Sequence, residues 1–239
     1  SDVIMAVVPM FHINAWQSPF VSTLVGAKQV IVRTQLDYPG ILDALQGEQV
    51  TFAAGVPTVW LGLLQELDKD PEAYDLSKLR SILIGGAAPP KAMIEGYAER
   101  YGVGIINSWG MTETASLATV TNPAEYPPDM PKNQRYGRNA RPGRPAPFVE
   151  IRGRAVDELV PWDGRTMGEL EVRGPWVAGA YYNRPEAADS FTEDGWLRTG
   201  DIATIVPDGS IELQDRAKDL VKSGGEWISS VALENALMS

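Results

Sequence analysis

Residues 107–115 read NSWGMTETA, and residues 102–107 just before them read GVGIIN. The GVGIIN run is short, apolar and β-branched, as is typical of a buried parallel strand. We therefore expect the polar run to emerge at the carboxyl end of a strand, where open α/β sheets bind ligands. Gly110 lets backbone approach a ligand, Thr112 and Thr114 carry hydroxyl donors, and Glu113 can hold Mg²⁺ on a phosphate. The stretch predicts a nucleotide-binding loop, with Trp109 as an aromatic wall.

A plainer interpretation of the same run stays open at this point. Ser108 or Thr112 can be the N-cap of a helix, with Glu113 as the acidic residue of its first turn. Short motifs of this kind also occur by chance, so the neighbouring segments have to decide.

The sequence upstream alternates between strand and helix patterns. Apolar runs typical of buried strands cover residues 3–8, 24–32, 50–54 and 79–84, and amphipathic patterns predict helices at 38–46, 59–67 and 91–101. This alternation predicts a parallel sheet flanked by helices. Residues 85–90 read GGAAPP, which leaves a shelf without large side chains at a strand end, as an adenine ring needs.

The downstream half has a different character. Residues 121–147 are rich in proline and glycine, and we interpret them as a loop-rich boundary without a packed core. Its regularly spaced arginines predict a solvated rim, with the phosphates of a ligand as the alternative partner: Arg135, Arg138, Arg141 and Arg144. Residues 148–151 and 168–174 alternate as half-solvated antiparallel strands do, which predicts a small barrel-like β-subdomain. The run GELEVRGPW, residues 168–176, is assigned a scaffold role.

Composition narrows the class of partner. The 239 residues carry a net charge of −10 and no cysteine. The acidic balance argues against a nucleic-acid or anionic-membrane surface, and the lack of cysteine excludes disulfides and a cysteine nucleophile. No apolar run approaches the roughly 20 residues of a membrane helix. We expect a cytoplasmic protein with small-molecule partners.

Five segments together resemble the adenylate-forming superfamily in order and spacing, and they resemble its fatty-acyl-CoA synthetase branch closely. They are PMFHINAW (9–16), GGAAPP (85–90), NSWGMTETA (107–115), DGWLRTGD (194–201) and IELQDRAKDLVKSGGEWIS (211–229). The resemblance implies that a fatty acid is activated by ATP to an acyl-adenylate and then transferred to coenzyme A, with release of pyrophosphate and AMP. It also implies Mg²⁺ as cofactor and a homodimer.

The resemblance assigns the acyl side of the site to the upstream segments. His12 is the only histidine, and a lone histidine in an apolar setting is more often a satisfied core residue than a catalyst. The resemblance reverses that preference and puts His12 beside the acyl carboxylate, with Trp16 as the gate of the fatty-acid tunnel. The remaining tunnel residues are Gly55, Val56, Pro57 and Trp109.

The resemblance also assigns the nucleotide, metal and coenzyme A residues. A Thr-Gly-Asp run is usually only a turn, but here Asp201 is implied to accept hydrogen bonds from both ribose hydroxyls, which suits an acceptor-only carboxylate. The implied ATP and AMP residues are Ile13, Gly86, Ala87, Asn107, Ser108, Trp109, Gly110, Thr112, Asp201, Arg216, Lys218, Lys222 and Trp227. The implied catalytic residues are His12, Thr112, Glu113 and Lys218, with Glu113 on the metal. The implied coenzyme A path is Gly224, Gly225, Glu226 and Trp227.

The resemblance divides the chain into three parts. They are an α/β subdomain with the adenine and acyl sites (1–125), a loop-rich segment with the β-subdomain (126–213), and the hinge with the start of a small carboxy-terminal domain (214–239). The fold class is thus part of the large domain of a synthetase, ending just past the hinge. A phosphate loop is expected upstream of Ser1 and a catalytic lysine downstream of Ser239, so we expect the chain alone to be inactive.

Two alternatives to a fatty-acid ligase remain open. Other carboxylate-activating enzymes, such as aryl-CoA ligases, luciferase-like oxidases and peptide-synthetase adenylation domains, share the nucleotide residues and differ in the acyl pocket. The second alternative is a non-catalytic nucleotide-binding module. One departure from the family pattern bears on the pocket floor, because Trp109 stands where tyrosine is usual and Ser108 where glycine is common.

Overall fold

The computed structural model describes residues 1–32, 37–156, 158–217, 221–223 and 226–228. The chain forms two compact units, Ser1–Ala140 and Arg141–Ser239, which are described one at a time. The predicted α/β class is confirmed, with a parallel-rich sheet flanked by helices and a separate antiparallel sheet. The predicted three-part division stays a prediction. Within the described residues, no helix is long and apolar enough to cross a lipid bilayer.

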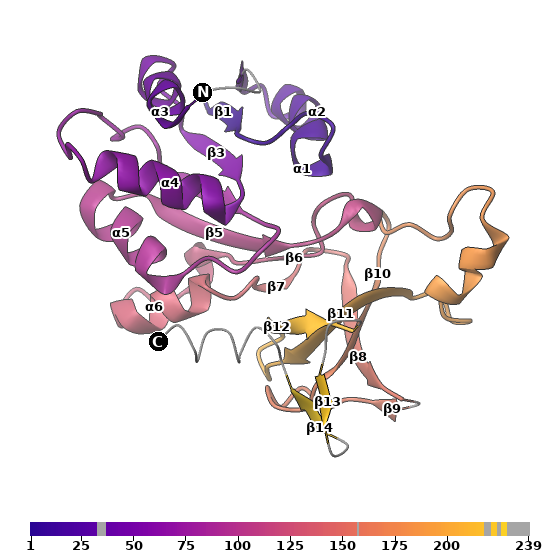
Figure 1. Cartoon of the computed structure of the whole chain (residues 1–239). Helices are drawn as coiled ribbons and strands as arrows, with labels where there is room; N and C mark the ends of the chain where they lie inside the picture. Colours follow the sequence, from indigo (N-terminus) through magenta and orange to yellow (C-terminus); the bar gives the residue numbers. More distant parts are fainter. Residues whose placement is uncertain (33–36, 157, 218–220, 224–225, 229–239) are drawn as a thin grey trace. The chain divides into compact units, whose positions relative to one another are not determined.

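The first unit is built on a mainly parallel sheet. Its strands lie in the order β2 (Lys28–Ile31), β1 (Val3–Ala6), β3 (Phe52–Gly55), β4 (Ser81–Ile84), β5 (Gly104–Trp109) and β6 (Thr119–Val120), with β6 antiparallel to β5. Figure 1 shows α3 (Tyr38–Gly47), α4 (Pro57–Leu67) and α5 (Lys91–Tyr101) on one side of β1 and β3, and α1 (Ile13–Trp16) and α2 (Ser18–Leu24) on the other. This arrangement follows from right-handed crossovers between parallel strands.

The core of this unit lies between the sheet and helices α3, α4 and α5. The predicted helices at 38–46, 59–67 and 91–101 agree with these three elements to within about two residues at each end. Their apolar side chains repeat at helical spacing and are buried against alternate residues of the strands. The helical contributors are Ile41, Leu42, Leu45, Trp60, Leu63, Leu64, Leu67, Met93, Ile94 and Tyr97.

Two predicted segments of this unit were wrong. The strand expected from residue 24 begins only at Lys28, because helix α2, which has Pro19 in its first turn, continues to Leu24. The boundary expected to be loop contains helix α6 (Lys132–Asn139), which begins after Pro131. Its Tyr136 packs into the core and donates a hydrogen bond to Glu99, 2.7 Å between the oxygens. A segment whose composition is typical of a loop is therefore helical and contributes a buried aromatic residue to the core.

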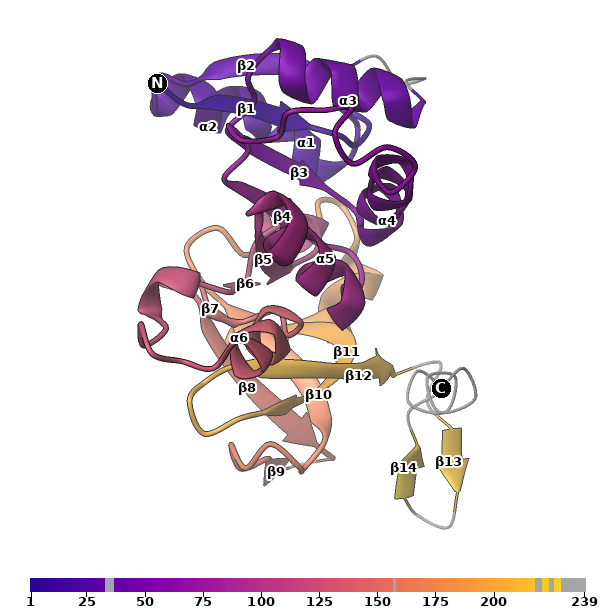
Figure 2. The same ribbon diagram turned by 90° about the vertical axis from the view of Figure 1, so that its left-hand side faces the viewer.

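The second unit is an antiparallel sheet, whose main strands are visible in Figure 2. Its order is β12 (Ile211–Arg216), β11 (Leu197–Ile205), β10 (Gly168–Arg173), β8 (Glu150–Ala155) and β9 (Glu158–Leu159). Shorter elements are the strand β7 (Arg144–Pro145), the 3-10 helix η3 (Pro185–Ser190), and the hairpin of β13 (Val221–Ser223) and β14 (Glu226–Ile228). The predicted alternation is present, because Leu170 and Val172 are fully buried on one face of β10 while Glu169 and Glu171 face the other way.

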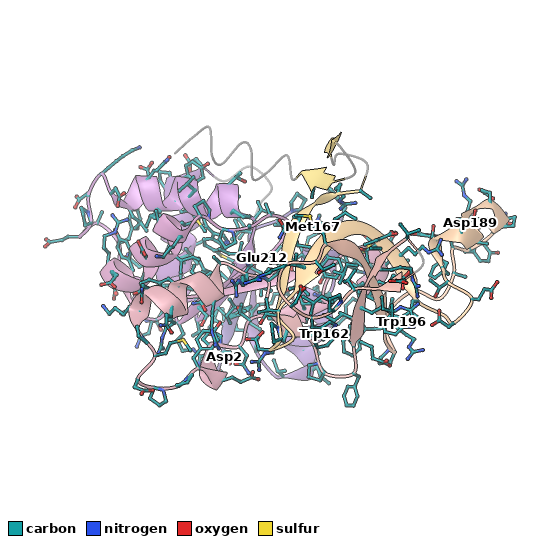
Figure 3. All side chains as sticks on the ribbon, turned by 90° about the horizontal axis from the view of Figure 1, so that it is seen from below. Asp2, Trp162, Met167, Asp189, Trp196 and Glu212 are labelled. Carbon is teal, nitrogen blue, oxygen red and sulfur yellow. The ribbon has the colours of Figure 1, made fainter. Side chains whose placement is uncertain are left out.

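The polar face of this sheet holds a cluster of charged side chains, which we call the Glu171 cluster. Glu171 is 0% exposed, and its carboxylate binds Arg152 at 2.5 Å and Arg154 at 3.1 Å, N to O. Trp196, labelled in Figure 3, lies under the guanidinium groups of Arg152 and Arg173, 4.3 and 4.6 Å from its ring centroid. These charged side chains shield one another from water, although the alternation of apolar and polar residues along β10 predicts that this face is exposed to solvent.

The predicted arginine rim is partly paired. Arg141 binds Glu212, which Figure 3 labels, at 3.4 Å, and Arg144 binds Asp208 at 3.5 Å. Each of these four side chains is at least 34% exposed, so the interpretation as a solvated surface is retained for this part of the run.

The Glu171 cluster also predicts a pH dependence of folding. Arg152 forms a bidentate bridge to Asp194, and its hydrogen bonds hold the pKa of Asp194 well below the ordinary value of about 3.9. A lowered folded-state pKa stabilises the fold above about pH 4, and this contribution is lost as the pH falls further. We expect Asp194→Asn to be less stable than the wild type at pH 7 and closer to it in stability at pH 2, by urea denaturation. An equal difference at both pH values would contradict this, and Asp189→Asn is the matched control.

Candidate functional site

Most of the predicted acyl and adenine residues lie at one edge of the first sheet. Strands β1, β3, β4 and β5 are adjacent and parallel, so their carboxyl ends meet at the same edge. His12, Gly55, Gly86 and Asn107 each lie in or just after one of these ends. Topology therefore brings together residues that are far apart in the sequence.

The histidine segment forms the entry to α1. His12 is exposed and caps the helix, because its Nδ1 accepts a hydrogen bond from the Asn14 backbone N–H at 3.2 Å. The core-residue interpretation is therefore wrong, and the cap involves only one of the two ring nitrogens. Ile13 begins α1, and Trp16 at its end is 57% exposed with its ring centroid 6.4 Å from that of Phe20.

One contact ties this segment to the loop after β5. The side-chain amide of Gln17 donates a hydrogen bond to the hydroxyl of Ser116, across 99 residues of sequence. Ser116 and its neighbour Ala115 both have left-handed backbone, with φ of 68° and 48°. Non-glycine residues seldom adopt that conformation, and such strain often marks functional loops. Nothing in the sequence pattern indicated this link.

The predicted adenine shelf follows β4. Gly86 has φ of 89°, a conformation that favours glycine, and Gly86, Ala87 and Ala88 are all exposed. The shelf is thus an open stretch of backbone with small side chains. Gly55, in contrast, is buried, and a Cβ there would lie 2.8 Å from the indole nitrogen of Trp60. In this structure Gly55 leaves room for the Trp60 ring. It is followed by Val56, the N-cap of α4, and by Pro57, the first residue of that helix.

Ser108 and Trp109 were expected after the strand that ends at Asn107, but they are the last two residues of β5. Pairing with β6, Ser108 to Val120 and Trp109 to Thr119, extends the strand. Their side chains are nearly closed off, with exposures of 2% for Asn107, 8% for Ser108 and 7% for Trp109. The Asn107 side-chain amide donates to the Ala140 carbonyl at 2.9 Å, and the Ser108 hydroxyl donates to the Ile84 carbonyl at 3.1 Å.

The loop beyond β5 carries the predicted phosphate and metal residues. A 3-10 turn, η1 (Thr112–Thr114), has Met111 rather than Ser108 or Thr112 at its N-cap, so the interpretation as a helix start capped by those residues was wrong. Thr112 is exposed, Glu113 is half-buried and Thr114 is buried. The Thr114 hydroxyl accepts from the Met111 N–H at 2.9 Å, which fixes the turn. The loop therefore presents Thr112 and Glu113 at its surface.

Gly110 also has a packing role in this loop that the sequence did not indicate. A Cβ on Gly110 would lie 2.3 Å from the Ser116 carbonyl oxygen and 2.7 Å from the Leu117 nitrogen. The close backbone approach is therefore to the chain itself. We expect Gly110→Ala to lower the free energy of unfolding by about 2–3 kcal/mol, because backbone cannot give way as a flexible side chain can.

Chemical denaturation of Gly110→Ala beside Gly137→Ala would test this expectation. Gly137 lies in α6, where a Cβ meets nothing within 4 Å, so alanine there is neutral or stabilises by up to about 1 kcal/mol. Equal stability of the two variants would contradict the packing role of Gly110.

The second unit holds the predicted ribose residues. Asp201 lies on β11 opposite Arg216 on β12, and Arg216 Nε is 2.7 Å from Asp201 Oδ1. Asp201 is only 7% exposed, whereas the Arg216 side chain is 56% exposed. The arginine fixes one carboxylate oxygen. Glu169 and Thr199 accept hydrogen bonds from the backbone at Gly200 and Asp201. The sequence analysis assigned Glu169 only a scaffold role.

The hinge residues are only partly described. Lys218, Gly224 and Gly225 lie outside the described residues, as does everything after Ile228. Lys222, Glu226 and Trp227 lie on the β13–β14 hairpin, where Lys222 pairs with Trp227, and only their backbone is described.

Comparison with known proteins gives a consistent match. The sequence profile of the family "AMP-binding enzyme" matches residues 1–182. A long-chain-fatty-acid–CoA ligase of Thermus thermophilus is 45% identical over 99% of this chain and 44% of its own length. A medium-chain-fatty-acid–CoA ligase of Ectopseudomonas oleovorans is 41% identical over 98% of this chain and 42% of its own length.

Solved structures agree on the fold. An O-succinylbenzoate coenzyme A synthetase of Bacillus subtilis, in complex with ATP and magnesium ion, superposes with a TM-score of 0.83 at 29% identity, covering 100% of this chain and 46% of that one. The chain thus spans less than half the length of each of these three relatives.

Proposed function

Because the chain belongs to the family of AMP-binding enzymes, we propose that the natural protein is an acyl-CoA ligase that activates a fatty acid with ATP. The observation that carries the proposal is the gathering of His12, the Gly86 shelf and the Thr112–Thr114 turn at one edge of a parallel sheet. Ligands of open α/β sheets bind at that edge.

The proposed chemistry requires no nucleophilic side chain. The fatty-acid carboxylate attacks the α-phosphorus of ATP and pyrophosphate leaves; the coenzyme A thiol then displaces AMP to give the thioester. The protein positions the reactants and stabilises the charge that develops on the phosphate. His12 and Trp16 serve the acyl group, whereas Thr112 serves the α-phosphate.

The remaining nucleotide roles are also proposals. In the first unit, the shelf at Gly86 and Ala87 takes the adenine face, and Asn107, Ser108 and Trp109 form the buried support beneath it. In the second unit, Asp201 and Arg216 take the ribose. Lys218, Lys222 and the segment from Gly224 to Trp227 keep the hinge and coenzyme A roles that the resemblance gives them.

Glu113 has the chemistry to hold Mg²⁺. Its carboxylate is half-buried on a loop, and the described residues contain no group of three or more His, Asp or Glu that would cage a metal by themselves. Magnesium in phosphate sites is commonly held by one or two carboxylates together with substrate oxygens and water. When bound, the ion neutralises phosphate charge, and Glu113 would anchor it.

The choice of a fatty acid rests on the acyl segment and on the relatives. PMFHINAW places an exposed indole, Trp16, at the same sheet edge as His12. The two ligases above are named for long- and medium-chain fatty acids, whereas the Bacillus synthetase is named for an aromatic acid. An aryl-CoA ligase is therefore the second candidate.

A carboxylate screen on the natural protein tests the proposal. Pyrophosphate release would be measured with ATP, Mg²⁺ and either alkyl acids of 6 to 18 carbons or substituted benzoates, with and without coenzyme A. We expect release with the alkyl acids and thioester formation only with coenzyme A. Preference for benzoates would replace the fatty-acid proposal with an aryl-CoA ligase, and AMP binding without any release would indicate a nucleotide-binding module. Size measurement in the same preparation would test the homodimer.

A further inference from the structure

The turn that carries Asp201 is an irregularity in an otherwise regular pair of strands. Glu171 of β10 pairs with Arg198 of β11, and Glu169 pairs with Ile202. Between these pairs β10 has only residue 170, whereas β11 has residues 199 to 201. The extra residues form a bulge, and bulges often redirect a side chain toward a functional site.

Thr199 closes this bulge from within. Its hydroxyl donates a hydrogen bond to the Leu170 carbonyl at 2.7 Å and accepts one from the Asp201 N–H at 3.1 Å. Thr199 is 5% exposed, so both bonds are shielded from water. The hydroxyl thus ties the backbone of Asp201 to β10.

Glu169 holds the central residue of the bulge. Its Oε1 accepts a hydrogen bond from the Gly200 N–H at 3.1 Å, and the Gly200 carbonyl accepts one from the Ala217 N–H at 2.8 Å. Gly200 has a φ of 71°, a backbone conformation that favours glycine. Because a glycine backbone is flexible, these two hydrogen bonds help to hold Gly200 in that conformation. A hydrogen bond to an ionised acceptor is stronger than one between neutral groups.

We propose that Glu169 is a positioning residue for nucleotide binding: it anchors the Gly200 amide and so holds the Asp201 carboxylate in place for the ribose. This inference rests on the proposed function, in which Asp201 binds both ribose hydroxyls. It gives the segment GELEVRGPW, which the sequence assigned to the scaffold, a part in substrate recognition. Glu169 itself touches no nucleotide.

The test uses the preference for ribose over its dideoxy form, which general loss of stability would not change. Calorimetry on the natural protein would give the dissociation constants of AMP and 2′,3′-dideoxy-AMP for the wild type and for Glu169→Ala, Glu169→Gln, Glu150→Ala and Asp201→Ala. We expect the wild type to prefer AMP by about 100-fold, since two hydroxyls bind a carboxylate. Glu169→Ala should reduce that preference about tenfold and leave dideoxy-AMP affinity unchanged.

The other variants separate positioning from ordinary packing. Glu169→Gln keeps an oxygen that accepts the Gly200 N–H and should retain the preference within about twofold. Glu150→Ala removes an exposed partner of Arg173 on the same sheet, away from the bulge, and should behave as wild type. If Glu169→Ala does not fold, Glu169→Asp serves instead, because its carboxylate is too short to reach Gly200 and should likewise reduce the preference.

The outcomes distinguish this inference from the function on which it rests. A full preference for AMP in Glu169→Ala or Glu169→Asp, together with its loss in Asp201→Ala, would overturn the positioning role and leave the ribose role of Asp201 intact. A wild type that binds AMP and dideoxy-AMP equally would overturn both. Equal weakening of both ligands in the Glu169 variants would also overturn positioning, since it would indicate only damage to the fold.

Discussion

Asp201→Ala is expected to weaken AMP binding about 100-fold. The carboxylate is 7% exposed and is held by Arg216 at 2.7 Å, so it is ordered before any ligand arrives. Hydrogen bonds to an ionised group contribute about 1.5–3 kcal/mol each, and two of them are lost in the variant. Part of that loss is recovered by water, which leaves about 2.7 kcal/mol, or 100-fold in the dissociation constant.

The matched control for this measurement is Asp208→Ala. Asp208 also pairs with an arginine in the second unit, Arg144 at 3.5 Å, but no nucleotide role is proposed for it. Isothermal titration with AMP should give a wild-type constant for Asp208→Ala. If Asp201→Ala binds AMP as tightly as the wild type, the ribose assignment is wrong; if both variants lose affinity equally, the effect is general.

The sequence was sufficient to predict the features that depend on the spacing of apolar residues and on glycine or proline at the ends of helices and strands. Helices α3, α4 and α5 were predictable because their apolar residues repeat every three or four positions, and the edge that gathers His12 and Gly86 was predictable because parallel strands share a direction. The conformation of Gly86 was consistent with a strand-end turn. The helices and the glycine turn are local features, and the shared edge follows from the common direction of the parallel strands.

The features that the sequence missed depend on contacts between distant residues. The bond from Gln17 to Ser116 has no local signal, and neither does the pairing with β6 that extends β5 through Ser108 and Trp109. Gly110 is required by the close approach of the Ser116 backbone, a contact that no short motif could reveal. Glu171 is the clearest case, because alternation places it toward water and three arginines remove it from water.

Glu171→Gln is accordingly expected to give the largest loss of stability among the charged residues of the second unit. The carboxylate is 0% exposed, and the side chains of Arg152 and Arg154 beside it are only 14% and 26% exposed. Removing one partner of a buried pair leaves the other charge without compensation, which costs about 3–5 kcal/mol. Arg152 keeps Asp194 and the face of Trp196, so we expect the lower end, about 3 kcal/mol.

Urea denaturation at pH 7 would measure this loss against Glu150→Gln. Glu150 also pairs with an arginine across the same sheet, Arg173 at 2.7 Å, but both side chains are exposed, 58% and 43%. Removing an exposed pair costs less than about 1 kcal/mol, because water replaces the lost partner. The difference between the two variants isolates burial, since charge, residue type and sheet are the same. If Glu171→Gln costs no more than Glu150→Gln, the arginines are solvated in practice and the Glu171 cluster does not stabilise the second unit.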